Sequence, residues 1–426
     1  MKRIAALLLL LSCTIVGFAQ ISSGPSNQNL SPAERSMAQA KKLIERNPND
    51  FEAYNALALA LSRRARETSS VAFYHQGEEA LQNSFALSPD NFDGQRIRVW
   101  LLLGKHEFGA ALEAARKLSQ NMPDDVMLYG FLTDANVELG NYKEAETAAQ
   151  WMLDLKPGNM PGLTRAAYLR ELFGDIDGSL DLMNMAYQST PPAEVEDGAW
   201  IVTQMAHLNL SIGKIDEAEK LSQQALAMFP GYHYALGNLA KVRIRQKRYD
   251  EAVQLLRQRY QAAPHAENLF DLARALVLAA RREEAKQAFA EFEQKSLLET
   301  NRADNSNHEL IFYYADYANQ PAKALEVARR EYARRHDVFT LDCYAWALHA
   351  NGQNQEALKQ VSIALAVGIR DANFFRHAGE IALAAGDHRT AERYLRQSAE
   401  LNALGSEGAQ VTLTRLSESA VGGVGP

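Results

Sequence analysis

The chain has 426 residues, of which 47% are apolar and 23% are charged, and its formal net charge is −7. This apolar share is typical of folded proteins and argues against a largely disordered chain. The small acidic excess argues against a nucleic-acid partner, because binding to a phosphate backbone depends on clustered positive charge. Two cysteines are too few for a disulfide framework or for a zinc site of the usual Cys/His spacing.

The first residues, 1–19, have the pattern of a secretory signal peptide. Lys2 and Arg3 supply the positive start, an apolar run follows, and small residues precede a cleavage point at Gln20. The apolar run of about 15 residues is shorter than the roughly 20 that a membrane-spanning helix needs. We therefore expect an exported protein, periplasmic or secreted, with no transmembrane span after cleavage. Lipid attachment at Cys13 is the alternative.

Both ends of the mature chain differ from its middle. Residues 20–32 are polar and predict a linker, after which Ser31 and Pro32 are the residue types of a helix N-cap and first turn. Residues 406–426 predict a short capping helix and a flexible tail.

A 34-residue spacing runs through the rest of the chain. Prolines recur at this interval, and small residues and glycines keep the same step. The positions are Pro89, Pro123, Pro157 and Pro191, Pro230 and Pro264, Ala111, Ala145 and Ser179, Gly140 and Gly174, and Gly352 and Gly386. Agreement among three residue types at one interval indicates an internal repeat.

Residues 126–159 show how one repeat is built. Two amphipathic stretches, VMLYGFLTDANVEL and YKEAETAAQWMLDL, predict two helices. Between them, Gly140 can adopt positive φ and end the first helix, and the small Ala145 lets the two helices approach closely. Pro157 cannot continue the second helix. Helices this short are marginally stable alone, so the apolar stripes must be buried by stacking one repeat on the next.

These residues resemble the tetratricopeptide repeat family over residues 33–405. The resemblance implies an all-α protein, a right-handed α-solenoid of about ten stacked helix–turn–helix repeats, with a concave groove lined mainly by the first helix of each repeat. It also implies a non-enzymatic scaffold that binds protein or peptide partners in that groove.

The 34-residue period is interrupted near 62–76, 192–199 and 293–317. Insertions in such arrays form loops that often lie beside the binding face; neutral growth of a loop is the alternative. The repeat around 305–338 is irregular, and its sequence predicts a normal second helix after a compressed turn.

No motif of a catalytic or cofactor site is present: there is no GxGxxG, Walker-type loop, HExxH or GxSxG. Asp175 and Asp177 lie in a segment too short for a calcium loop and predict a tight turn instead. We therefore expect no catalytic residue, no cofactor and no metal. The less favoured alternative is an enzyme or small-molecule site in the irregular region 295–350, built from His308, Asp316, Asp342, Trp346 and His349.

The repeat register predicts which side chains face the groove, and aromatic and arginine side chains there are typical of binding hot spots. The candidates are Tyr168, Glu171, Trp200, Thr203, His207, Tyr234, Lys241, Phe270, Arg274, Asp342, Trp346, His349 and Arg376. Packing between neighbouring repeats is the alternative role for each of them. Some members of the family bind a C-terminal carboxylate with a Lys/Asn/Arg clamp, but the full set is missing here.

Two functions remain open from the sequence. The first is an exported scaffold that binds protein segments in the groove. The second is an accessory subunit of an envelope machine for secretion, polysaccharide export or outer-membrane assembly.

Overall fold

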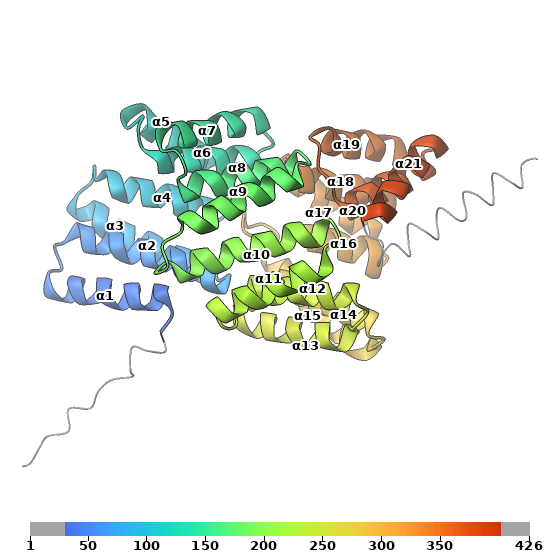
Figure 1. The fold of residues 1–426 in the computed structure, drawn as a ribbon, viewed down its shortest axis with the longest axis horizontal. Coiled ribbons are helices and arrows are strands. Elements are labelled where there is room, and N and C mark those ends of the chain that lie inside the picture. Colours follow the sequence, from blue (N-terminus) through green and yellow to red (C-terminus); the bar gives the residue numbers. More distant parts are fainter. Residues whose placement is uncertain (1–29, 402–426) are drawn as a thin grey trace, which may run out of the picture.

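The computed structural model describes residues 30–401, and this part of the chain consists of helices and their connections (Figure 1). Helix α1 precedes ten antiparallel hairpins, which pair α2 with α3 and so on to α20 with α21. The first half contains α1 (Pro32–Arg46), α2 (Phe51–Thr68), α3 (Ala72–Leu87), α4 (Phe92–Gly104), α5 (Phe108–Asn121), α6 (Val126–Glu138), α7 (Tyr142–Leu155), α8 (Met160–Leu172), α9 (Ile176–Ser189), α10 (Val195–Ser211) and α11 (Ile215–Met228).

The second half contains α12 (His233–Arg245), α13 (Tyr249–Ala262), α14 (Ala266–Leu278), α15 (Arg282–Glu299), α16 (Asn307–Phe312), a π-helix η2 (Tyr313–Tyr317), α17 (Pro321–Tyr332), α18 (Val338–Ala350), α19 (Asn354–Ala366), α20 (Ala372–Ala384) and α21 (His388–Leu401). The predicted signal peptide, most of the linker and the C-terminal capping helix lie outside the described residues. Within residues 30–401, no helix is both long and apolar enough to cross a membrane.

The predicted hairpin geometry is confirmed at residues 126–159. Helix α7 has the predicted bounds, Gly140 adopts a φ of 78°, and Ala145 is 0% exposed where the two helices meet. The predicted N-cap is also present, because the Ser31 hydroxyl accepts the Glu34 amide and the Glu34 carboxylate accepts the Ser31 amide.

The first helices of the hairpins lie on the inside of a curved stack. Neighbouring first helices contact one another, as α2 does α4, α6 does α8 and α10 does α12, whereas second helices of neighbouring hairpins are farther apart. A stack whose first helices are closer together must curve toward them. The inner surface of the superhelix is therefore formed mainly by the first helix of each hairpin, as the family resemblance implies.

The superhelix closes on itself, so that distant repeats touch. The Arg335 guanidinium lies 3.0 Å from the Glu138 carboxylate, 197 residues away, and the Val338 amide donates to the Tyr142 hydroxyl at 2.9 Å. The ends of α8 and α9 also lie beside the last hairpins (Figure 1). Leu172 shares an apolar cluster there with Ile369.

Two of the interrupted segments meet at a second closing contact. Arg66, near the end of the long helix α2, pairs with Glu196 and with Asp197, at 2.5 Å, in the first turn of the long helix α10. Ser69 approaches the His233 ring at 3.4 Å. The extra residues thus extend helices toward each other instead of forming loose loops.

The third interruption supplies another closing contact. The long loop after α15 carries Asp304, whose carboxylate lies 3.8 Å from the His106 ring on the α4–α5 turn. The buried Glu331 holds this loop, since its carboxylate accepts from Asn305 at 3.1 Å and from Asn307 at 2.6 Å. The irregular repeat that follows has a short α16 that continues as η2 before a compressed turn, in agreement with the sequence.

Replacing Gly140 tests the closure. A Cβ atom at Gly140 would lie 2.6 Å from the His336 carbonyl oxygen of the facing turn, whereas one at Gly213, with a similar φ of 77°, would meet nothing within 4 Å. Both Gly→Ala substitutions cost about 1–2 kcal/mol for the left-handed backbone. We expect Gly140→Ala to lose about 1–3 kcal/mol more, as in overpacked cores, in parallel thermal and urea unfolding. Equal losses would show that the turns do not touch in solution.

Candidate functional site

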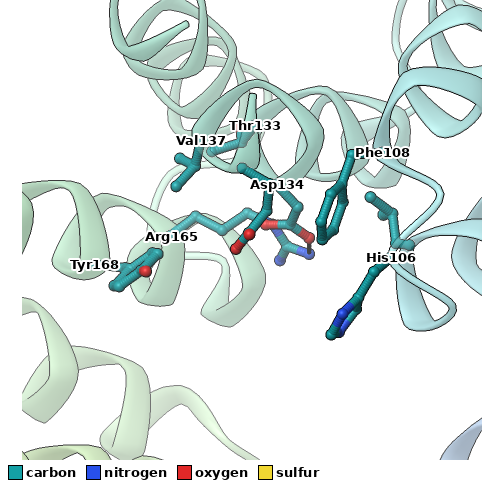
Figure 2. Close-up of a pocket in the computed structure, with 9 residues that line it drawn as sticks. His106, Phe108, Thr133, Asp134, Val137, Arg165 and Tyr168 are labelled. Atoms are coloured by element: carbon teal, nitrogen blue, oxygen red, sulfur yellow. Dashed lines mark hydrogen bonds and ion pairs between the residues drawn. The ribbon is translucent and has the colours of Figure 1, made fainter. Parts of the chain in front are cut away.

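A cavity of about 270 Å³ opens on the inner surface beside the closing contact (Figure 2). Its walls come from the α4–α5 turn, α6 and α8. The lining residues are Leu103, His106, Phe108, Thr133, Asp134, Val137, Glu138, Arg165 and Tyr168. Three aromatic rings, of His106, Phe108 and Tyr168, and three acidic or basic side chains, Asp134, Glu138 and Arg165, therefore line one open cavity.

The acidic groups of this cavity are positioned by helix geometry and by arginines. Asp134 and Glu138 are four residues apart on α6 and so share one face. Arg165 of α8 reaches across to Asp134 at 2.5 Å and donates to the Gly130 carbonyl at 3.1 Å. Glu138 pairs with Arg335 from the facing repeat.

A second cavity of about 320 Å³ lies on the other side of the same contact. His106 and Phe108 line both cavities, and their rings stack at 5.3 Å. The remaining lining residues are Glu107, Gly109, Ala110, Asn301, Ala303, Glu331, Arg334 and Arg335. Since Glu138 lines one cavity and Arg335 lines the other, their ion pair stands between the two.

Burial changes the protonation of groups around Arg335. Loss of hydration, reinforced by the charge of Asp337, raises the pKa of Glu138 to about 7, although Arg335 opposes the shift. Burial and the neighbouring Arg335 charge lower the pKa of His308 to about 3. His308 is therefore neutral, and its Nε2 can accept from Arg335 at 3.3 Å.

Nine of the thirteen predicted groove residues are at least partly exposed. Tyr168 lines the cavity, and Lys241 and Arg274 are exposed. Glu171 and His207 of adjacent first helices pair at 2.8 Å. The other half-buried candidates are Trp200, Tyr234, His349 and Arg376.

Four of the predicted residues are buried and pack within the fold. Thr203 donates to the carbonyl of Ala199 in its own helix, and Phe270 is only 3% exposed in the main apolar cluster. Asp342 accepts from the His377 ring at 2.8 Å. Trp346, at 7% exposed, is the fourth. Packing within the fold, the alternative role, therefore describes these four side chains.

Neither of the two cavities is lined by the residues of the alternative site in 295–350. Trp346 donates to Asp316 at 2.8 Å, but His308 binds the Thr340 hydroxyl at 3.0 Å and His349 binds Asn354 at 2.8 Å. In residues 30–401, no group of three or more His, Cys, Asp or Glu side chains is placed to hold a metal ion.

Sequence reasoning missed the residues at the closing contact. His106, Phe108, Glu138 and Arg165 come from three successive repeats, but Arg335, which reaches Glu138, comes from a distant repeat that the 34-residue period does not relate to them. The interruptions of the period were the only available signal, because they mark where the helices and loops reach across the superhelix.

Comparison with known proteins agrees with this fold. Tetratricopeptide repeat patterns match residues 40–78 and 210–267. A TPR repeat-containing protein, MJ1428, of Methanocaldococcus jannaschii is 27% identical over 157 residues, which are 36% of this chain and 26% of that protein. The chain is therefore a tetratricopeptide repeat protein that matches about a quarter of this relative's length.

Two solved structures have the same overall architecture. A monomeric mutant of IFIT1 with Gppp-AAAA has a TM-score of 0.51 at 14% identity, with 87% of each chain covered. The human IFIT1 dimer with m7Gppp-AAAA has a TM-score of 0.50 at 15% identity, with 87% of this chain and 86% of that chain covered. At these identities the likeness shows the fold, an α-helical repeat solenoid.

The elevated pKa of Glu138 makes stability depend on pH. Folding raises this pKa from its ordinary 4.5 to about 7, so the folded protein retains a proton that the unfolded chain releases. Stability therefore falls as the pH rises from about 4.5 to 7. We expect Glu138→Gln to flatten this fall by on the order of 1–3 kcal/mol, measured by urea unfolding from pH 4 to pH 8.

The matched control is Glu146→Gln, which neutralises an exposed carboxylate on α7. This control should leave the pH profile of the wild type unchanged. Identical profiles for the two variants would contradict the assignment of the pH dependence to Glu138.

Proposed function

We propose that this chain is a non-enzymatic scaffold that binds segments of partner proteins on the inner surface of its superhelix. Support comes from the repeat fold, in which the first helices of several neighbouring hairpins contact one another on the inner side of the stack. The observation that carries the proposal is the pair of cavities at the closing contact, which combine aromatic rings with arginines and carboxylates. Such a mixture is typical of protein-binding surfaces.

The closure favours an extended segment over a folded domain as the bound part of the partner. Each cavity has room for a few side chains, at about 270 and 320 Å³. An extended segment can place successive side chains in both cavities and along neighbouring first helices. A folded domain would contact only their rims.

Export is the second element of the proposal, supported by the signal-peptide pattern of residues 1–19. An exported scaffold could act as an accessory subunit of an envelope machine for secretion, polysaccharide export or outer-membrane assembly. Mass analysis of the mature N-terminus is the direct test. A first residue of Gln20 supports a secretory signal, whereas a lipid-modified Cys13 would replace this part of the proposal with membrane anchoring.

Crosslinking in native cells tests the scaffold function. We expect tagged wild-type protein to enrich specific protein partners, and a variant with Tyr168, Lys241 and Arg274 changed to Ala to lose them, because Tyr168 lines the first cavity and Lys241 and Arg274 are exposed groove candidates. The control variant changes Trp151, Lys143 and Lys286, which are exposed on second helices. Equal enrichment by both variants would rule out the inner surface as the binding face.

A further inference from the structure

Three cations on the inner surface differ from Arg165 and Arg335 in having no ion-pair partner among the described residues. Lys241 and Arg245 on α12 and Arg274 on α14 form no ion pair with any carboxylate of residues 30–401. By contrast, Arg165 and Arg335 pair with carboxylates at 2.5 and 3.0 Å. An unpaired guanidinium held partly away from water loses hydration without compensation.

Helix geometry brings the three cations to one side. Lys241 and Arg245 are four residues apart and share a face of α12. Lys241 and Arg274 both act on the Asp271 carboxylate of α14, so they approach it from neighbouring first helices. That carboxylate is already bound by Arg259 at 2.6 Å and therefore neutralises neither of them fully.

Arg245 is the clearest case of an uncompensated charge. It is half-buried at the end of α12, and burial lowers its pKa. The nearest acid that acts on it is Asp371, whose carboxylate oxygen already accepts the Asn373 and Phe374 amides as the N-cap of α20. An arginine nevertheless stays charged at neutral pH.

Aromatic side chains adjoin this group of cations. The Arg274 guanidinium lies 5.7 Å from the centre of the Phe270 ring. Tyr317, in the π-helix η2, packs edge-on against Phe270 at 6.1 Å and remains 40% exposed. The π-helix therefore presents a tyrosine beside Arg274, which forms no direct ion pair within the described part of the chain although the charges of Asp271 and Asp316 act on it.

We propose that Lys241, Arg245 and Arg274 form a subsite for the side-chain carboxylates of an acidic protein segment. This inference rests on the proposed scaffold function and names the chemistry of its partner. Aspartate or glutamate side chains would give each cation the direct ion pair with a carboxylate that it lacks in the free protein. Tyr317 would contact the apolar part of the same segment.

The surroundings favour an acidic peptide over a nucleic acid. The Asp271 carboxylate of α14 interacts with Lys241 and Arg274, and Asp316 also acts on Arg274. These carboxylates would repel a polyphosphate backbone with one charge per nucleotide, whereas a peptide can space its acidic side chains to match three cations.

Fluorescence anisotropy with defined probes tests the subsite on the full chain. The probe is an amidated, fluorescein-labelled peptide of Glu, Gly, Ser and Tyr, compared with peptides in which Gln or Lys replaces Glu. We expect the Glu peptide to bind about tenfold or more tightly than the Gln peptide. Its affinity should fall with rising salt concentration.

The subsite variant carries Lys241→Gln, Arg245→Gln and Arg274→Gln. Its control carries Lys117→Gln, Lys143→Gln and Lys286→Gln, which remove the same charge from exposed positions on second helices. Circular dichroism confirms that both are folded. Loss of the Glu-peptide preference in the subsite variant alone is the expected result.

Other outcomes would overturn the subsite. These are equal binding of the Glu and Gln peptides, equal loss in both variants, tighter binding of a single-stranded RNA probe, or binding only when the peptide has a free C-terminal carboxylate. Crosslinking tests the scaffold function separately. Partners that need the inner surface but carry no acidic segment would support the scaffold function even if the acidic subsite is absent.

Discussion

The contact between Arg335 and Glu138 is the constraint on which the inner surface depends. A helical solenoid normally has contacts only between adjacent repeats, so its concave face is open along its whole length. Here one ion pair and the hydrogen bond from Val338 to Tyr142 join repeats almost 200 residues apart. Without them, the second cavity would lose the wall that the loop after α15, Arg334 and Arg335 place opposite the α4–α5 turn.

Arg335 can hold this position because a guanidinium offers several donors in a fixed plane. It faces Glu138, His308 and the ring of Phe108, and Glu331 and Asp337 each lie 3.7 Å away. One arginine thus shares its charge among several acids, and the elevated pKa of Glu138 reflects the incomplete compensation. A lysine has a single point of charge and could not serve all of these acceptors.

The hairpins could be predicted from the sequence because their causes are local. Gly140 ends one helix and Ala145 permits close packing, and both effects act within a single repeat. The closing contacts could not be predicted. In the second of them, Arg66 and Glu196 are 130 residues apart, and no shared period relates them. The register also placed Phe270 and Trp346 on the correct helices but did not determine whether each side chain points inward or into the core.

Charge is distributed unevenly over the inner surface for a structural reason. Arg66, Arg165 and Arg335 are already engaged by carboxylates that close or line the superhelix. Removing either member of such a partly buried pair leaves the other charge without compensation, so these arginines are held by the fold. Lys241 and Arg245 of α12 and Arg274 of α14 form no such ion pair within residues 30–401. An overall acidic chain can therefore still present available positive charge inside, at the place where its own carboxylates are already occupied.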